Sequence, residues 1–259
     1  MVEKVVFGEH IFYLGDVLEV LDLIEDKSVD LVLTSPPYNV GKNYENHNDL
    51  MPYDEYLNWL SKVFSKIYLK LKDDGRFVLN ISSVFYDGEY KPLFIDAVNI
   101  CRNIGFKIRN DIIWNKNQIS KRTAWGSFAN PSDPNVLQPY EYIFVFNKNL
   151  KKHIGNKENI DITKEEFIKF TNALWEIKPE NRKEILDVCP APFPEELVYR
   201  VVKLFTYVND VVMDPFGGSG TVSKVCAELK RRSIYIDNSK RAFDFAIKRV
   251  KIVFDVKNI

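Results

Sequence analysis

The sequence feature that most constrains the fold is a short apolar strand that ends abruptly at two prolines. Residues 29–34 are Val-Asp-Leu-Val-Leu-Thr, and the next four are Ser35, Pro36, Pro37 and Tyr38. A compact apolar run of this length is typical of a buried parallel strand. Consecutive prolines fix φ and remove two backbone donors, so the ladder of the strand cannot continue. We therefore expect a rigid turn at the carboxyl end of a strand, where open α/β sheets bind ligands.

This turn offers the groups that a flat heterocycle requires. The prolines leave backbone carbonyls without a role in the sheet, and the aromatic ring of Tyr38 follows directly. A fixed acceptor beside a ring suits a base that has an exocyclic amine. The alternative is a plain Pro-Pro strand terminator beside a core tyrosine, and these residues alone do not separate the two interpretations.

The final third of the chain contains a second strand that ends in a glycine-rich turn. Residues 210–214 are Asp-Val-Val-Met-Asp, and residues 215–220 are Pro-Phe-Gly-Gly-Ser-Gly. A helical pattern follows, and the next predicted strand, residues 233–237, ends in an acid. Glycines let the backbone pass close to a ligand, and an acid after the second strand suits ribose hydroxyls. The pattern predicts a nucleotide-type βαβ unit, with a tight structural turn as the alternative for the glycines alone.

Two phosphate-binding motifs do not fit this turn. The dinucleotide fingerprint is incomplete because Ser223 stands where its third glycine belongs, and a P-loop is excluded because no Gly-Lys-Ser/Thr follows. The turn contains Asp214 and Phe216 but no lysine or arginine. A ligand with a cationic centre suits these residues better than one with phosphates.

The rest of the chain alternates predicted strands with amphipathic helices. Its 259 residues are 46% hydrophobic and 28% charged, which suffices for one large α/β domain with a mostly parallel sheet. The amino terminus has no signal-like apolar core, and no apolar run approaches the roughly 18 residues of a membrane span. Three scattered cysteines and three isolated histidines indicate neither a disulfide framework nor a metal site. We therefore expect a cytoplasmic protein without a metal site or a membrane partner.

Basic residues are concentrated in two stretches, although the formal net charge of the chain is zero. They occupy residues 101–124 and 147–157, next to the irregular segment 115–140 and a predicted small helical insert at 158–187. A solvated basic face is the plain interpretation. Aromatic residues nearby favour a surface that follows the phosphates of a nucleic acid. The candidate DNA-binding residues are Lys116, Lys121, Arg122, Trp125, Lys151 and Lys152.

Together the two turns resemble those of a known family, the amino DNA methyltransferases of the permuted beta class. In that family a Ser/Asp-Pro-Pro-Tyr block precedes a Phe-x-Gly-x-Gly block, as residues 34–38 precede residues 216–220 here. Residues 190–197 are similar to the family's helix before the cofactor loop. The resemblance implies one Rossmann-like domain, residues 1–259, with circularly permuted motif order. It also implies a mostly parallel seven-stranded sheet, helices on both faces and target-recognition insertions near 115–140 and 147–187.

The resemblance implies S-adenosylmethionine as the cofactor. Its ribose would bind Asp237, its adenine would lie near Asp16, and its methionine end would lie against residues 216–220. The cofactor-binding residues would be Asp16, Phe193, Asp214, Phe216, Gly217, Gly218, Ser219, Gly220, Thr221 and Asp237. The catalytic residues would be Ser35, Pro36, Pro37 and Tyr38. Ser35 and the Pro36 carbonyl would hold the acceptor amine, and Tyr38 would stack on a base flipped out of the duplex.

The implied activity is methyl transfer to DNA, and Ser rather than Asp before Pro-Pro-Tyr favours N4 of cytosine. The enzyme would serve a restriction–modification system whose endonuclease is a separate chain. Its oligomeric state would be a monomer or a homodimer, and the sequence does not separate the two. N6 of adenine is the alternative within the class. Further alternatives are a methyltransferase acting on RNA, protein or a small molecule, and a non-catalytic DNA-binding module. Carbon-5 cytosine methylation is excluded because Cys189-Pro190 reverses the required Pro-Cys order.

Overall fold

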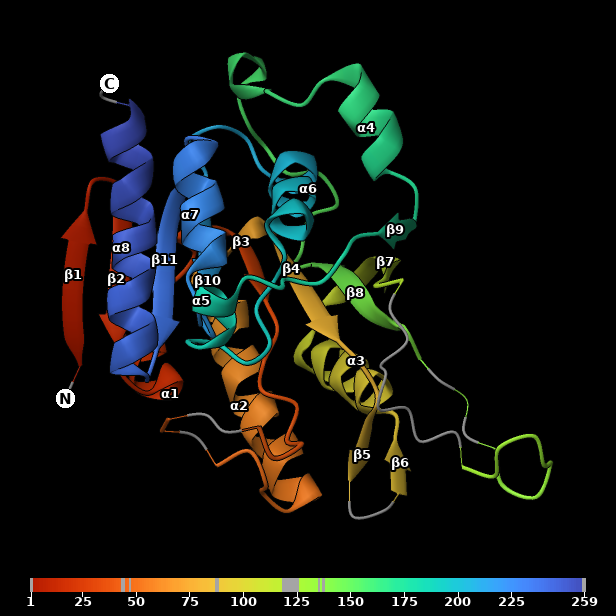
Figure 1. Cartoon of the computed structure of the whole chain (residues 1–259). Helices are drawn as coiled ribbons and strands as arrows, with labels where there is room; N and C mark the ends of the chain where they lie inside the picture. The colour runs from red at the N-terminus through yellow and green to blue at the C-terminus, as the bar shows by residue number, and fades with distance from the viewer. Residues whose placement is uncertain are drawn as a thin grey trace.

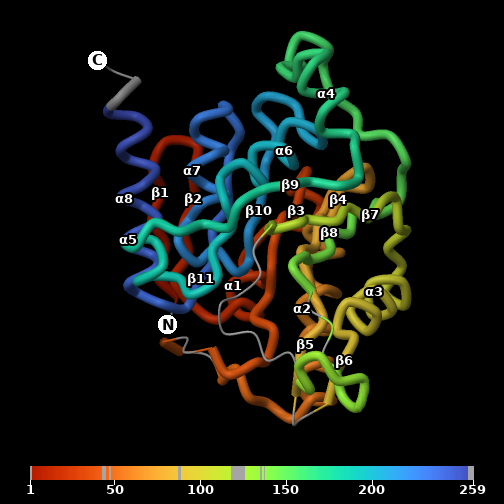
Figure 2. The backbone as a smooth tube through the Cα atoms, turned by 45° about the vertical axis from the view of Figure 1, so that its right-hand side comes forward, coloured from red at the N-terminus to blue at the C-terminus, as the bar shows by residue number. Residues whose placement is uncertain are grey.

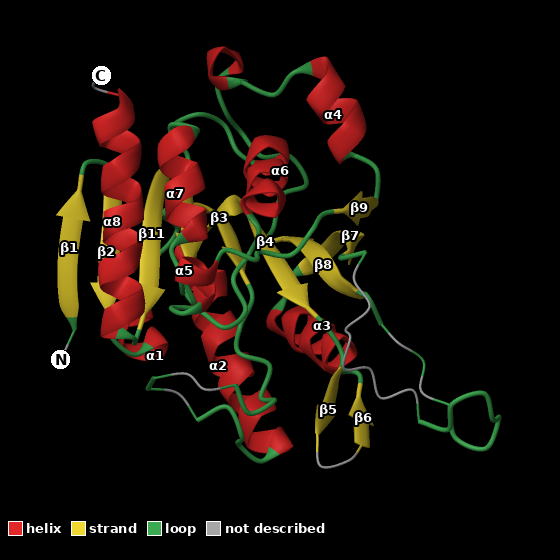
Figure 3. Cartoon of the chain, viewed as in Figure 1, coloured by secondary structure: helices red, strands yellow, loops and turns green. Residues whose placement is uncertain are grey.

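A single large sheet forms the centre of the molecule (Figures 1 and 3). The computed structural model describes residues 2–42, 45–46, 48–86, 89–117, 126–134, 136 and 138–257. Within these residues the sheet has nine strands in the order β1-β2-β11-β10-β3-β4-β8-β7-β9. Their bounds are β1 (Glu3–Phe7), β2 (His10–Leu14), β3 (Val29–Thr34), β4 (Leu71–Ile81), β7 (Lys107–Asn115), β8 (Tyr140–Asn147), β9 (Leu174–Glu176), β10 (Val211–Asp214) and β11 (Arg232–Asp237).

The expectation of seven strands was wrong, because the described sheet has one additional outermost strand on each side, β1 and β9. β1 folds back on β2 as the antiparallel arm of the amino-terminal hairpin. At the other edge β9 pairs in parallel with β7, so the insert that follows β8 is not purely helical. A separate short hairpin consists of β5 (Val84–Tyr86) and β6 (Glu89–Lys91).

The centre of the sheet is parallel, as the sequence predicts. β2, β11, β10, β3 and β4 all run in one direction, and β8 is antiparallel to β4 and to β7. β3 and β10 are direct neighbours, since Leu31 pairs with Val212 and Val32 with Met213. The Pro-Pro turn and the glycine-rich turn therefore leave adjacent strands at the same edge of the sheet. The side of the sheet at the carboxyl ends of its parallel strands is called the carboxyl edge below, and the side at their amino ends is called the amino edge.

Helices cover both faces of the sheet, which confirms the expected layering (Figure 1). Their apolar stripes explain this arrangement: Phe64 and Ile67 are fully buried on one side, and Leu197 and Val201 on the other. One layer contains α1 (Val17–Leu23), α2 (Tyr53–Lys70) and α3 (Leu93–Ile104); the other contains α6 (Glu195–Phe205), α7 (Thr221–Glu228) and α8 (Lys240–Lys257). None of the described helices is long and apolar enough to cross a membrane.

The insert after β8 contains segments at both the amino edge and the carboxyl edge of the sheet. It forms η1 (Lys157–Asn159) and α4 (Lys164–Phe170) at the amino edge, then β9, and finally α5 (Lys183–Leu186) near the carboxyl edge (Figure 2). Asp161 fixes the first part, because both of its oxygens accept hydrogen bonds from the buried guanidinium of Arg231 at 2.5 and 2.8 Å. The two ends of the insert therefore serve different parts of the molecule.

His153, which the sequence presents as isolated, lies among three carboxylates at the amino edge. Its Nδ1 is 3.1 Å from Asp74, its Nε2 is 2.7 Å from Asp210, and Asp30 lies 4.0 Å away. Burial acts to lower the pKa of His153, but the hydrogen bond to Asp210 and the neighbouring negative charges outweigh it and raise the pKa. His153, Asp30 and Asp210 lie close enough to one another to ligate a metal ion. Since both ring nitrogens already face carboxylates, we interpret the group as a protonated His153 that forms ion pairs with Asp74 and Asp210.

Candidate active site

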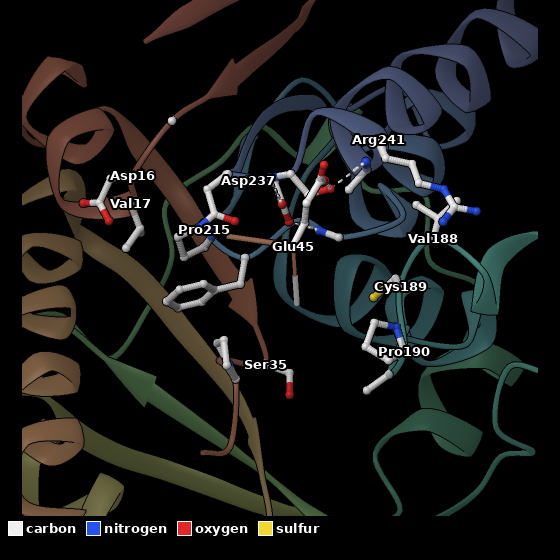
Figure 4. A pocket seen from close by; sticks show the side chains of 18 of the residues that line it. Asp16, Val17, Ser35, Glu45, Val188, Cys189, Pro190, Pro215, Asp237 and Arg241 are labelled. Carbon is white, nitrogen blue, oxygen red and sulfur yellow. Dashed lines mark hydrogen bonds between the residues drawn. The ribbon is translucent and has the colours of Figure 1, made fainter. Parts of the chain in front are cut away.

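A cavity of about 590 Å³ opens at the carboxyl edge beside the ends of β3, β10 and β11 (Figure 4). A smaller cavity of about 30 Å³ adjoins it, and Ser35 and Phe216 line both. Of the ten predicted cofactor residues, only Gly220 lines neither cavity. Those that do are Asp16, Phe193, Asp214, Phe216, Gly217, Gly218, Ser219, Thr221 and Asp237.

The glycine-rich turn packs closely against Tyr235 of β11 and Ala246 of α8. Gly220 has a φ of +74°, and a Cβ added there would lie 2.4 Å from the Cβ of Ala246 on α8. A Cβ at Gly217 would lie 2.2 Å from the ring of Tyr235. The hydroxyl of Tyr235 donates to the Gly218 carbonyl at 2.8 Å. Contacts inside the protein therefore require glycine at 217 and 220, before any ligand is considered.

Asp237 ends β11 and receives the turn directly. Its two oxygens accept hydrogen bonds from the backbone N–H groups of Gly218 and Ser239, both at 2.8 Å. Burial raises its pKa, although these hydrogen bonds oppose the shift. An ionised carboxylate accepts about four hydrogen bonds, so Asp237 retains acceptor capacity toward the cavity. Asp16 also faces the cavity while capping α1, where it accepts from Leu18 N–H at 2.8 Å.

Asp214 connects the two turns. Its Oδ1 accepts from the Thr34 hydroxyl at 2.7 Å and from the Phe216 N–H at 3.1 Å. Burial raises the pKa of Asp214 to about 7, despite both hydrogen bonds. Thr34 is the last residue of β3 and lies 180 positions earlier in the chain. This carboxyl group therefore fixes the end of one strand against the turn that follows the other.

An ion network lies beneath the glycine-rich turn. Arg249 donates to the Ser219 carbonyl and the Thr221 hydroxyl at 2.9 Å, and to Glu195 at 2.7 Å. Glu195 also pairs with Arg182 and Lys224, at 2.7 Å each. Burial acts to raise the pKa of Glu195, but the hydrogen bonds from Lys224 and Arg182 prevail and lower it to about 2. The network ties α6, α7 and α8 to the segment that follows β9.

The Pro-Pro turn ends β3, as its sequence predicts, because the strand stops at Thr34. The hydroxyl of Tyr56 on α2 donates to the Pro37 carbonyl at 2.6 Å. That carbonyl is therefore engaged, and none of the described residues donates to the carbonyl of Pro36. Ser35 donates to the Tyr38 hydroxyl at 3.0 Å. Ser35 thus stands between the cavities on one side and Tyr38 on the other.

A buried polar cluster next to this turn is absent from the sequence predictions. The Tyr38 hydroxyl lies 3.1 Å from Glu141 and accepts from the Asn80 amide at 2.9 Å. Asn80 also donates to Glu141, and Lys116 forms an ion pair with Glu141. Burial, followed by the charge of Glu141, raises the pKa of Tyr38 well above its ordinary value. The local signal for this cluster in the sequence is a polar residue near one end of each of two strands: Asn80 in β4 and Glu141 in β8.

Of the six candidate DNA-binding residues, the structure describes Lys116, Lys151 and Lys152, and it places Lys116 away from the other two. Lys121, Arg122 and Trp125 lie outside the described residues. The ammonium of Lys116 is engaged with Glu141 at the carboxyl edge. Lys151 and Lys152 are exposed but directly precede His153 at the amino edge. β3 has six residues, so the two edges are about 20 Å apart.

Further residues line the large cavity that the sequence did not single out. Trp59 on α2 lies with its ring centre 5.6 Å from that of Phe216. Glu45 accepts a hydrogen bond from the hydroxyl of Ser239. Residues 186–191 form the opposite wall, including Val188, Cys189 and Pro190 in Figure 4. Residues 190 and 191 of this wall belong to the segment 190–197 whose resemblance to the family was noted in the sequence. Residues 186–189 belong to no motif, so the sequence did not indicate them.

Comparisons with known proteins agree with this geometry. The profile of a DNA methylase family matches residues 29–248. The chain is 47% identical over 162 residues to Type II methyltransferase M.MjaVI of Methanocaldococcus jannaschii, covering 62% of this chain and 83% of that protein. Protein TTHA0409 of Thermus thermophilus, solved in complex with S-adenosyl-L-methionine, has a TM-score of 0.73 at 30% identity and 94% coverage of both chains. The cytosine-N4-specific PvuII DNA methyltransferase shares the fold, with a TM-score of 0.71, 22% identity and coverage of 96% and 91%.

The residues around the cavities fit S-adenosylmethionine. An acid that retains acceptor capacity, Asp237, follows β11 where ribose hydroxyls are bound in such folds. The paired rings of Trp59 and Phe216 suit a cationic sulfonium, and the turn itself has no basic side chain. The chain therefore belongs to the family of N4/N6 amino-DNA methyltransferases, and its cofactor is S-adenosylmethionine.

Proposed function

We propose that this protein methylates the exocyclic amine of a base flipped out of double-stranded DNA, with N4 of cytosine as the acceptor. One observation supports this most strongly. Ser35, a residue of the Pro-Pro turn, lines the large cavity as well as the small one, and Asp214 ties the two turns together. An acceptor held at Ser35 would adjoin a cofactor held at Asp237 and Phe216.

The residues of the cavity bind and orient the reactants. When bound, S-adenosylmethionine supplies an electrophilic methyl group. Asp237 would accept hydrogen bonds from the ribose hydroxyls, Asp16 would lie toward the adenine, and the Phe216 ring would stabilise the positive charge. Residues 186–191 line the cavity on the side of the insert. Most of the rate then arises from holding donor and acceptor in line.

The Pro-Pro turn prepares the acceptor amine. The amine is a weak nucleophile because its lone pair is conjugated with the base ring. Hydrogen bonds from the amine to Ser35 Oγ and to the Pro36 carbonyl favour a pyramidal nitrogen and expose that lone pair. Tyr38 presents its ring to the flipped base, which cannot reach such a site from within a duplex. Neutral product forms by loss of a proton to solvent, so no strong general base is needed.

The choice of base rests on the sequence of the turn. Ser rather than Asp before Pro-Pro-Tyr favours cytosine N4, and adenine N6 is the alternative. The name of the Type II relative supports a restriction–modification role, in which a separate endonuclease cuts the unmethylated sequence. For target recognition we propose the segment near 115–140, which contains the connection from β7 to β8 at the carboxyl edge. Residues 151–170 lie at the amino edge and are not part of this proposal.

Product analysis tests the activity and the base together. The protein is incubated with S-adenosylmethionine labelled in its methyl group and with unmethylated genomic DNA. The DNA is then digested to nucleosides and separated. We expect label in N4-methylcytosine; label in N6-methyladenine would contradict the assignment of the base. DNA without label, from a protein that binds the cofactor in calorimetry, would contradict the proposed activity.

A further inference from the structure

We propose that Glu141 is a positioning residue for methyl transfer: acting through the Tyr38 hydroxyl, it orients Ser35 as a hydrogen-bond acceptor for the target amine. The inference rests on the proposed function, because it assigns the amine to Ser35. Glu141 is the second residue of β8 and lies opposite Trp114 of β7. It is far in sequence from either motif and lines neither cavity.

The hydrogen bonds around the Tyr38 hydroxyl have a fixed direction. Glu141, when ionised, can only accept, and so can the main-chain carbonyl of Asn80, at 3.1 and 3.2 Å from the phenol oxygen. The phenol donates its proton to Oε2 of Glu141, because a charged acceptor forms the stronger hydrogen bond. The phenol oxygen is then an acceptor for its other neighbours. It receives one hydrogen bond from the Asn80 amide at 2.9 Å and one from the Ser35 hydroxyl at 3.0 Å. The chain of donation therefore runs from Ser35 through Tyr38 to Glu141.

This direction decides what Ser35 offers to a ligand. A hydroxyl has one proton and two lone pairs. Because the Ser35 proton points at Tyr38, both lone pairs of Ser35 can accept. One faces the Asn80 amide at 3.5 Å, and the other remains for a donor on the side where the cavities lie. An exocyclic amine is such a donor. Without Glu141, the phenol proton is shared between the main-chain carbonyl of Asn80 at 3.2 Å and the Ser35 oxygen at 3.0 Å. Whenever it points at Ser35, the Ser35 hydroxyl accepts it and turns its own proton toward the amine.

The surroundings of Glu141 are built to keep it in place. Its side chain is only 14% exposed, which is costly for a charge unless the charge is paired. Lys116 balances it, and the Lys116 ammonium also lies 4.9 Å from the Trp114 ring centre. Asn80, which is 2% exposed, donates to both Glu141 and Tyr38. The phenol is thus held at three points, which also fixes the plane of the ring that is to stack on the base.

A double-mutant cycle tests this inference. The variants are Glu141→Gln and Tyr38→Phe, alone and combined, in the full chain. We expect Glu141→Gln to lower kcat by about 10- to 100-fold with an unchanged Kd for S-adenosylmethionine. In the Tyr38→Phe background the same substitution should change kcat less than twofold, because the hydroxyl through which Glu141 acts is gone. The interaction free energy of Glu141 and Tyr38 is the difference between the effect of the double substitution and the sum of the two single effects.

Tyr56→Phe is the matched control. It also removes a tyrosine hydroxyl from the Pro-Pro turn, but that hydroxyl binds the Pro37 carbonyl rather than Glu141. In the Tyr56→Phe background the full effect of Glu141→Gln should persist. An equal effect of Glu141→Gln in the Tyr38→Phe background would overturn the inference and point to direct contact with substrate. Normal turnover in Glu141→Gln would overturn it as well.

Two further readouts keep the test decisive. If Glu141→Gln does not fold, Tyr38→Phe alone decides, since a parental kcat there contradicts a role for the hydroxyl. Thermal unfolding gives a second cycle, in which Glu141→Gln should lower the Tm of the parent more than that of Tyr38→Phe. This cycle does not depend on turnover. A parent that shows the Tm coupling but methylates no DNA would therefore reject the proposed function, whereas a methylating parent without coupling would reject the inference.

Discussion

The two halves of the active site are constructed differently. The cofactor half consists of backbone and close packing: glycines at 217 and 220 lie against Tyr235 and Ala246, and Asp237 accepts from two backbone N–H groups. The base half consists of side chains that hold one another, with Tyr38 at the centre. Packing tolerates almost no change in volume. The loss of one hydrogen-bonding group creates no clash but changes the direction of the hydrogen bonds that remain.

This difference separates the expected consequences of mutation. Changes in the cofactor half should reduce stability and cofactor binding together, because the same contacts serve both. Changes in the base half should reduce turnover and leave cofactor binding intact. The predictions below test this contrast, beginning with the largest expected effect.

Replacement of Gly220 should have the largest effect. In Gly220→Ala the new methyl group would clash with Ala246, and the residue would keep a left-handed conformation. We expect a loss of about 2–4 kcal/mol in the free energy of unfolding, together with loss of cofactor binding. Urea unfolding and calorimetry measure the two. Gly8→Ala is the control, because Gly8 has a φ of +57° but its nearest neighbour would be 3.4 Å away. Equal losses in both variants would show that packing at 220 is unimportant.

Glu195 should make the cofactor half sensitive to acid. Its pKa in the folded protein is about 2, below the ordinary 4.5, so its contribution is present above pH 4.5 and lost as the pH falls toward 2. Glu195→Gln should reduce stability at pH 7 by an amount on the order of 3 kcal/mol and flatten the profile between pH 4.5 and 2. Glu196→Gln is the control, since Glu196 is more exposed and, among the described residues, forms an ion pair with Arg200 alone. An unchanged acid limb in Glu195→Gln would refute the role of the network.

Asp214 should show the opposite pH dependence. Its folded pKa of about 7 exceeds the ordinary 3.8, so the stability that it contributes is complete below pH 3.8 and is lost as the pH rises through 7. Asp214→Asn keeps an acceptor for Thr34 and Phe216 but cannot ionise. The variant should match the parent near pH 3.5 and exceed its stability at pH 8 by up to about 4 kcal/mol. A less stable variant at pH 8 would mean that Asp214 is ionised and favourably paired.

The sequence predicted the cofactor half better than the base half for a physical reason. Residues 216–220 and Asp237 belong to one βαβ unit, so their relation follows from local periodicity and turn chemistry. The polar cluster depends on the pairing of β4 with β8 and of β8 with β7, which brings Asn80 and Glu141 together across 61 positions. Neither residue belongs to a motif. Long-range register of this kind leaves no trace in a local pattern.

The same limitation explains the strands and charges that were misplaced. β9 has three residues and joins the sheet through backbone pairing with residues 113–115, so its sequence gives little indication of a strand. The basic stretch 147–157 looked continuous with the site because β8 connects them. β8 runs antiparallel to β4, however, and takes the chain from the carboxyl edge to the amino edge. His153 then holds the stretch there.

The smallest expected effect concerns Lys151 and Lys152. Since both lie at the amino edge, Lys151→Ala combined with Lys152→Ala should change the Kd for DNA less than twofold at any salt concentration. A phosphate contact would instead flatten the dependence of log Kd on log salt by about 0.9 for each lysine. Fluorescence anisotropy across a salt series measures this slope. A flattened slope would place DNA on the amino edge and contradict the division of the molecule described above.

The most direct test of the two-part site is a single comparison of binding with turnover in Ser35→Ala. Ser35 is a small residue beyond the end of β3, and its removal leaves the glycine-rich turn, Asp237 and Asp214 untouched. We predict that Ser35→Ala binds S-adenosylmethionine with the parental Kd in calorimetry. Its rate of methyl transfer to DNA should fall by about 100-fold or more, as expected when a hydrogen bond at the reacting group is lost. Parental turnover in this variant, or loss of cofactor binding, would contradict the account.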